Sequence, residues 1–133
     1  MEYNRRKYHN MPDNRTVGGK KIKFDSKKEA SRYDELMLML IAGKIRNLKL
    51  QPEFTLQESF TTADGERVQA VRYRADFSYE KKVRNRYEDY DGYEYVDEWE
   101  TVIEDVKTPG TKTALYLQKR KLCLDKGIRI TEV

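Results

Sequence analysis

Apolar residues recur along the chain with two spacings, one typical of a helix and one typical of strands. Between residues 30 and 41 they return every three or four positions, which predicts an amphipathic helix. Ser26 and Glu29 have the spacing of a capping box at its start, and Gly43 is a typical C-terminal stop. We therefore expect a helix between Ser26 and Gly43. The apolar positions of its buried face are Ala30, Tyr33, Leu36, Met37, Leu40 and Ile41.

Strand-like alternation dominates the middle of the chain. It surrounds Gln51-Pro52, continues over residues 68–79 and returns over residues 99–106. A second helix is expected over residues 111–126 and a last strand over residues 128–133. The order α-β-β-β-β-α-β predicts an α/β (α+β) fold with a mixed central sheet flanked by helices. Residues 1–20 are polar and basic, which predicts a flexible arm before a single domain of residues 21–133.

Composition excludes several classes of site. One cysteine (Cys123) and one histidine (His9) exclude an internal disulfide framework, a cysteine-based zinc site and a Ser-His-Asp triad. No apolar run approaches the roughly 18 residues that a membrane-spanning helix needs. We therefore expect a cytoplasmic protein of a bacterial host cell, with no membrane partner.

Charge is distributed unevenly along the chain. The formal net charge of +4 hides a basic excess in residues 1–50 and 111–133 and an acidic excess in residues 51–110. Basic segments are the usual footprint of polyanion binding, whereas clustered carboxylates repel phosphate unless a cation lies between them. This combination suggests a metal-dependent enzyme that acts on nucleic acid. On charge alone, a solvated and highly charged surface is the alternative.

The expected strand pairing brings acidic side chains together. If Asp91-Gly92 is a two-residue hairpin turn, the register places Asp76 opposite Lys107. It also places Ser78 opposite Asp105. The two carboxylates and the lysine then share one face, within roughly 4.5–8 Å of one another. Such a pair can hold a divalent cation for phosphodiester hydrolysis, and a lysine beside it can orient the attacking water. The structural alternative is a surface ion pair between Asp105 and Lys107.

Five short motifs follow one another in a recognisable order. They are FDSKKEA (24–30), LQP (50–52), YRADF (73–77), IEDVK (103–107) and a basic last helix that contains Thr113, Tyr116 and Lys119. Together they resemble the PD-(D/E)xK nuclease superfamily over about residues 20–133. The resemblance is to small phage and prophage nuclease-like proteins and to transposon-end nuclease subunits. It implies a restriction-endonuclease-like fold and a Mg²⁺- or Mn²⁺-dependent DNA endonuclease that leaves 5′-phosphate and 3′-hydroxyl ends.

The resemblance also implies roles for individual residues. Asp76 and Asp105 match the metal ligands and Lys107 the catalytic lysine. Glu29 matches an accessory acid that reaches the metal from the first helix, although the capping box explains it equally well. Gln51 matches the glutamine position and is assigned an accessory role. Ala75 stands where the superfamily name has proline, and Glu104 points away from the motif face, toward solvent or the opposite surface.

Further basic residues are candidates for phosphate contacts. Arg72 and Arg74 share the face of Asp76 if that strand is regular, and counter-ions to the carboxylates are the alternative. For the candidates on the last helix, the alternative to phosphate contact is an ordinary solvent-exposed helix face. The basic arm of residues 1–20 is either a backbone-tracking segment or a solubilising tail. The candidates on the last helix are Lys112, Tyr116, Lys119 and Arg120.

The substrate is the least defined part of the expectation. Branched DNA, as in Holliday-junction resolution during phage DNA recombination, is a natural substrate and requires a homodimer. Two alternatives stay open: a non-catalytic DNA recognition or assembly module, and an RNA-binding protein. Residues 80–98 look like an acidic, tyrosine-rich insertion. We expect its tyrosines to pack across the hairpin or at a dimer contact, because the surrounding acids would repel phosphate; they are Tyr87, Tyr90, Tyr93 and Tyr95.

Overall fold

The computed structural model describes residues 13–17, 20–107 and 112–133. Most of the expected arm (residues 1–12, 18 and 19) and the segment 108–111, where the second helix was expected to begin, lie outside the described residues. The chain forms two compact units, one ending at Gly43 and the other beginning at Lys44. The described residues form two helices and a larger set of strands, which confirms the mixed α+β class.

The first unit contains a hairpin and a helix. Strands β1 (Asp13–Val17) and β2 (Lys20–Phe24) pair antiparallel. Helix α1 (Lys27–Ile41) follows, and the rings of Phe24 and Tyr33 lie 5.2 Å apart between their centroids. Both aromatic side chains are buried, so the apolar face expected for this helix is confirmed at Tyr33.

Both ends of α1 lie where the capping residues predict. The Ser26 side-chain oxygen accepts a hydrogen bond of 3.1 Å from the Glu29 backbone N–H. This bond satisfies one of the amide groups that a helix leaves without an internal partner. Gly43 adopts φ +73°, the left-handed conformation that ends many helices and that glycine tolerates best. The capping-box serine and the stop glycine are therefore confirmed.

The second unit is built on a four-stranded mixed sheet. The strand order is β10-β9-β8-β3, with β10 parallel to β9 and the other pairs antiparallel. The mixed central sheet expected from the sequence is therefore confirmed. Its strands are β3 (Ile45–Leu50), β8 (Phe77–Asp89), β9 (Gly92–Asp105) and β10 (Ile130–Glu132).

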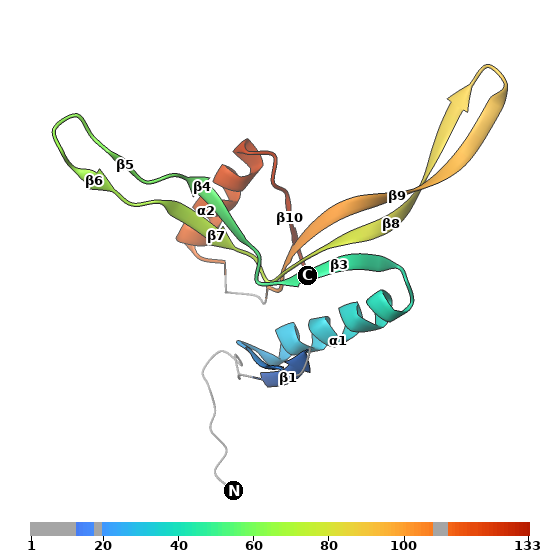
Figure 1. The fold of residues 1–133 in the computed structure, drawn as a ribbon, viewed down its shortest axis with the longest axis horizontal. Coiled ribbons are helices and arrows are strands. Elements are labelled where there is room, and N and C mark those ends of the chain that lie inside the picture. The colour runs from blue at the N-terminus through green and yellow to red at the C-terminus, as the bar shows by residue number, and fades with distance from the viewer. Residues whose placement is uncertain (1–12, 18–19, 108–111) are drawn as a thin grey trace, which may run out of the picture. The chain divides into compact units, whose positions relative to one another are not determined.

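Strands β8 and β9 form one long hairpin that contains the polar segment 80–98 (Figure 1). Asp89 pairs with Gly92, so the turn is Tyr90-Asp91 and not Asp91-Gly92. The expected turn was therefore wrong by one position and the pairing register by two. The Asp89 carboxylate accepts the Asp91 N–H at 2.8 Å and closes the turn. Gly92 follows it with φ +127°.

Two neighbouring segments of the chain, one at Pro52 and one at Ala75, both leave the strand conformation at the same point along the sheet, which we call the strand break. Pro52 has no N–H to donate to a ladder, and the chain bends there between β3 and β4 (Glu53–Gln57). On the adjacent segment, β7 (Val71–Arg74) ends before Ala75 and β8 starts at Phe77. The expected continuous strand over residues 68–79 was therefore wrong. Ala75 N–H donates to the Pro52 carbonyl at 3.0 Å and holds the two bends together.

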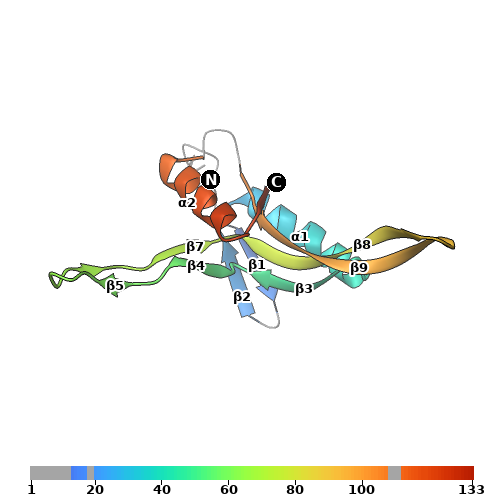
Figure 2. The same cartoon turned by 90° about the horizontal axis from the view of Figure 1, so that it is seen from above.

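Two arms of the second unit diverge from this break (Figures 1 and 2). One arm is the β8–β9 hairpin. The other consists of the β4–β7 pair, extended by the short strands β5 (Phe60–Thr61) and β6 (Arg67–Val68). The break is therefore the point at which the elements of this unit converge.

Helix α2 (Ala114–Asp125) begins at Thr113, whose side chain accepts the Tyr116 N–H at 3.1 Å. The expected helix is confirmed over Ala114–Asp125, and the expected stop glycine, Gly127, follows with φ +78°. Neither helix in the described part of the chain is long and apolar enough to cross a bilayer. The helix contributes Tyr116 and Cys123 to the core of the unit. The other members of that core are Leu56, Tyr73, Ala75, Ile103 and Ile130.

Candidate active site

Asp76 and Asp105 lie directly opposite each other at the strand break. The pairing of Phe77 with Glu104 places Asp76 across from Asp105, where the sequence register expected Lys107. The Asp76 N–H donates to the Glu104 carbonyl at 3.0 Å and to Asp105 Oδ1 at 3.1 Å. A shift of two residues preserves which face a side chain lies on, so the expected convergence of the carboxylates holds despite the wrong register.

Each of the two carboxylates also accepts a hydrogen bond from the backbone of the other's segment. Asp76 Oδ2 accepts the backbone N–H of Val106 at 2.7 Å, while Asp105 Oδ1 accepts that of Asp76. Hydrogen bonds from backbone amides to an ionised carboxylate are among the stronger ones in proteins. The backbone therefore orients both acids before any ligand arrives.

Lys107 completes the expected trio. Its Nζ lies 4.0 Å from Asp105 Oδ2 and 3.9 Å from the centroid of the Tyr116 ring. Its backbone N–H donates to the Val133 carbonyl at 2.9 Å, directly beyond β10. A cation over an aromatic face is attracted by the ring quadrupole. The sheet and the ring together hold the ammonium group beside the carboxylates.

Burial alters the acidity of Asp105. Its side chain is nearly inaccessible, and this desolvation raises its pKa from 3.8 to about 6. The Lys107 ammonium and the Asp76 N–H act in the opposite direction but do not cancel the effect. The ionised form of Asp105 is therefore costly in the metal-free protein, and a bound cation would offset that cost.

Tyr116 differs from the expectation. We expected it on an exposed face of the last helix, as a phosphate contact, but only 8% of it is exposed. Burial raises its pKa to about 12, so the phenol is neutral. The sequence did contain a signal: Tyr116 and Cys123 are seven residues apart, on the same side of the helix, and both are buried. Tyr116 supports Lys107 from the core.

Gln51 lies beside the carboxylates through its backbone. Its N–H donates to the Asp76 carbonyl at 2.9 Å, and its φ of +51° is in the left-handed region. That conformation costs a residue other than glycine about 1–2 kcal/mol. The fold therefore keeps a strained glutamine beside Asp76.

Replacing Gln51 with glycine separates backbone strain from a chemical role. Gln51→Gly should leave the free energy of unfolding unchanged or raise it by about 1 kcal/mol, because relief of strain outweighs the added chain entropy. Asn47→Gly is the comparison for stability, since Asn47 has φ +53° in β3, although it also loses the hydrogen bond from Asn47 to Glu80. Urea unfolding measures stability, and a cleavage assay measures activity. An accessory role predicts lower cleavage by Gln51→Gly than by the wild type; cleavage by Gln51→Gly at the wild-type rate would contradict that role.

Glu29 and Glu104 fall outside the carboxylate pair. Glu29 is buried in the first unit, where its N–H donates to the Ser26 side chain that caps α1, and its role as a metal ligand stays a prediction. Of the two expected positions for Glu104, solvent or the opposite surface, the first was wrong, because the residue is 1% exposed. It lies on the sheet face opposite Asp105, and its carboxylate accepts a hydrogen bond from the Tyr79 hydroxyl.

The expected phosphate contacts are spread over several elements. Lys112 and Arg120 both pair with Glu132, at 2.6 and 2.9 Å, and Glu132 is the β10 partner of Asp105. Arg120 therefore ties α2 to β10, and Lys112 ties the residues just before the helix to the same strand. Lys119 is half-buried on the same helix.

The arginines of β7 do not share the face of Asp76 by regular alternation, because the strand ends at Arg74. Arg72 is exposed and lies 3.6 Å from Glu53 of β4, and Arg74 is also exposed. Both side chains therefore belong to the β4–β7 arm. Contact of either one with phosphate stays a prediction.

The donor set limits which metals fit. Within the described ranges, no group of three or more His, Cys, Asp or Glu side chains is arranged to hold a metal ion. Asp76 and Asp105 provide two carboxylates with hard oxygen atoms. Mg²⁺ is usually bound by one or two carboxylates together with water and substrate phosphates. The pair therefore fits Mg²⁺ or Mn²⁺ better than a metal that needs a complete protein cage.

Comparison with known proteins identifies a family. Residues 5–130 match the model of a family described as "Protein of unknown function (DUF1064)". Neither the curated proteins nor the solved structures provide a match. Because the family model spans nearly all of the chain, the protein belongs to the DUF1064 family.

Proposed function

We propose that the protein is a metal-dependent DNA endonuclease with a restriction-endonuclease-like fold. The observation that carries the proposal is the pair of opposed carboxylates at the strand break, Asp76 and Asp105, with Lys107 4.0 Å from Asp105. The arrangement lies on a mixed sheet in the order of motifs expected for PD-(D/E)xK nucleases. A surface ion pair, the plainer alternative, does not fit a carboxylate as deeply buried as Asp105.

The residues present fit a divalent cation. Asp76 and Asp105 would hold it, because backbone hydrogen bonds have already oriented their carboxylates. When bound, Mg²⁺ or Mn²⁺ supplies Lewis-acid chemistry that activates water and neutralises charge on the phosphate. The buried position of Asp105 excludes water and strengthens electrostatic interactions at the site.

Lys107 supplies positive charge where negative charge develops during phosphodiester hydrolysis. The Tyr116 ring beneath its ammonium group and the Val133 carbonyl on its backbone restrict its position. Pre-positioned charge of this kind stabilises a transition state without reorganisation during the reaction. Lys107 would orient the attacking water or stabilise the scissile phosphate, leaving 5′-phosphate and 3′-hydroxyl ends.

Cleavage of defined DNA substrates tests this proposal. Labelled linear, single-stranded, flapped and four-way-junction DNA would each be incubated with Mg²⁺, with Mn²⁺ and with EDTA. We expect cleavage in both metals and none in EDTA. Preference for the junction, together with a homodimer by light scattering, would support resolution of branched DNA. Binding without cleavage in either metal would overturn the proposal in favour of a non-catalytic recognition module.

A further inference from the structure

The β8–β9 arm has two chemically different faces. Opposed residues of an antiparallel pair lie on the same face, and successive residues alternate between faces. The register therefore places Lys82, Arg84 and Arg86 on one face. The same face carries Trp99, Tyr95 and Tyr93, and Arg46 of β3 joins it through its pairing with Glu80. We call these seven side chains, Arg46, Lys82, Arg84, Arg86, Tyr93, Tyr95 and Trp99, the cationic–aromatic face.

Most acidic residues of the arm lie on the other face. The register places Asp89, Glu94, Glu98 and Glu100 there, with Lys81 as the basic residue among them. The sequence reasoning expected the surrounding acids to repel phosphate from the tyrosines; alternation directs these four to the side opposite Tyr93 and Tyr95, and the effect on phosphate stays a prediction. Three acids do share the cationic–aromatic face: Glu80, Glu88 and Asp97. Together with Lys49, the basic residues of that face outnumber them five to three.

The cations of this face are stacked on its rings. Arg46 lies 4.2 Å from the Trp99 ring centroid, Arg84 lies 4.7 Å from that of Tyr95, and Arg86 lies 4.1 Å from that of Tyr93. Stacking restricts the guanidinium groups, and Arg46 and Arg86 also pair with Glu80 and Glu88, at 2.5 and 2.8 Å. Half or more of the Tyr93 and Tyr95 surface stays exposed. The face therefore presents both fixed cations and accessible rings.

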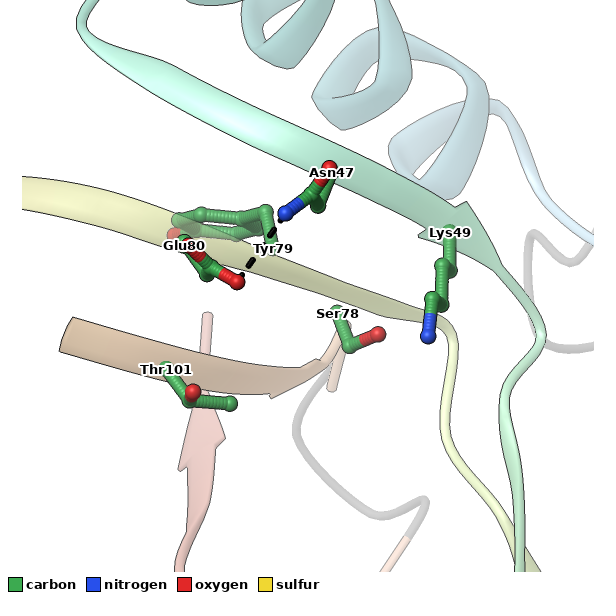
Figure 3. Close-up of a pocket in the computed structure, with 6 residues that line it drawn as sticks. All are labelled: Asn47, Lys49, Ser78, Tyr79, Glu80 and Thr101. Carbon is green, nitrogen blue, oxygen red and sulfur yellow. Dashed lines mark hydrogen bonds between the residues drawn. The ribbon is translucent and has the colours of Figure 1, made fainter. Parts of the chain in front are cut away.

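A cavity borders this face. It has a volume of about 420 Å³ and is lined by Asn47, Lys49, Ser78, Tyr79, Glu80 and Thr101 (Figure 3). Ser78 is two residues from Asp76, and Glu80 is two residues from Lys82, so the lining continues along one side of β8. Lys49 lies opposite Ser78 and adds a further cation. The cavity therefore lies along β8 between Asp76 and the first cation of the face, Lys82.

We propose that the cationic–aromatic face binds a single strand of DNA that leads to the Asp76–Asp105 site. Cations at two-residue steps along β8 suit successive phosphates, and exposed tyrosine rings suit unpaired bases, as in other single-strand-binding surfaces. Duplex DNA offers phosphates but no accessible base faces, so the rings favour a single strand. This inference rests on the proposed function for its choice of DNA as the ligand.

Binding measured without cleavage tests the inference separately from nuclease activity. Fluorescence anisotropy in EDTA would use the full chain and a labelled oligothymidylate of about 20 nucleotides, long enough to cover the arm. The combined variant Lys82→Ala, Arg84→Ala and Arg86→Ala should bind at least about tenfold more weakly. Its plot of log affinity against log salt should be shallower by about 2, since each lost phosphate contact removes about 0.7 from the slope.

Aromatic variants test stacking in the same assay. Tyr95→Ala should weaken binding roughly five- to tenfold, whereas Tyr95→Phe should bind as the wild type does. Lys81→Ala and Tyr87→Ala are matched controls on the acidic face and should change affinity less than about twofold. Circular dichroism of every variant checks that the hairpin remains folded.

Several outcomes would overturn the inference. Unchanged binding by the combined variant, or an equal loss in Lys81→Ala, would show that this face does not hold the strand. Tighter binding of an RNA of the same length would assign the face to RNA. Self-association of the wild type that the combined variant abolishes, with no change in DNA affinity, would assign it to a second copy of the chain. If the variants of the cationic–aromatic face weaken DNA binding but the wild type does not cleave in Mg²⁺ or Mn²⁺, the binding role of this face would be supported and the proposed nuclease activity would be contradicted.

Discussion

Replacing Asp76 with asparagine should lower DNA cleavage by at least about 10²–10³-fold while the protein remains folded. The amide keeps an oxygen that can accept the Val106 N–H, so the hydrogen bond that holds the strand break survives. The negative charge that would hold a divalent cation is lost. Calorimetric titration with Mn²⁺ should show weaker binding, and urea unfolding should show little change in stability.

Asp125→Asn is the matched control for this substitution. Asp125 is exposed at the end of α2, and its replacement should leave cleavage and Mn²⁺ binding unchanged. Cleavage by Asp76→Asn within a few-fold of wild type would contradict the assignment of Asp76. So would a loss of cleavage that the control shares.

Replacing Asp105 with asparagine should stabilise the metal-free protein by about 3 kcal/mol at pH 8. Burial raises the pKa of Asp105 from 3.8 to about 6 in the folded state. Between those two values the folded protein binds a proton more readily than the unfolded chain, so stability falls as pH rises through this window. Above about pH 6 the full cost is present, and a neutral asparagine does not incur it.

Urea unfolding in EDTA at pH 8 and at pH 4 measures this effect. The variant should exceed the wild type at pH 8, and the difference should shrink at pH 4, where Asp105 is protonated in the folded state. Adding Mg²⁺ at pH 8 should raise the melting temperature of the wild type more than that of the variant. A variant that is less stable than the wild type at pH 8 would show that Asp105 is a structural acid and not one held ready for a cation.

The carboxylate site could be predicted from sequence because it depends mainly on which face of the strand each residue lies on, and less on the exact pairing register. The expected hairpin turn was one position away from the real one, which moved every pair by two residues. A shift of two leaves each side chain on its own face, so Asp76 and Asp105 still meet. A shift of one would have separated them.

Other features depended on interactions that local patterns do not encode. The strand break at Ala75 follows from its hydrogen bond to the Pro52 carbonyl, a contact between distant segments. The position of Tyr116 was misjudged because basic neighbours on the helix suggested an exposed face, whereas Cys123 one repeat later marked the buried one. The placement of Glu29 relative to the carboxylates involves two separate units, and helix capping gave no information on it.

The polar arm shows the converse case. Its charges and tyrosines had no functional explanation as a linear sequence, because the basic residues lie on β8 and most of the acidic ones on β9. The register places most acids of the arm on one face and most of its cations on the other, with Arg84 opposite Asp97 as an exception. Because a shift of two residues leaves each side chain on its own face, the expected turn already implies this separation.

A time course of labelled DNA in Mg²⁺, comparing the wild type with Lys107→Ala, tests the nuclease proposal most directly. Lys121→Ala, an exposed lysine of α2, controls for general loss of positive charge. The proposal predicts cleavage by the wild type and by Lys121→Ala, none in EDTA, and a rate at least about 10²–10³-fold lower for Lys107→Ala. Cleavage by Lys107→Ala at the wild-type rate, or no metal-dependent cleavage by the wild type on any of the substrates, would contradict it.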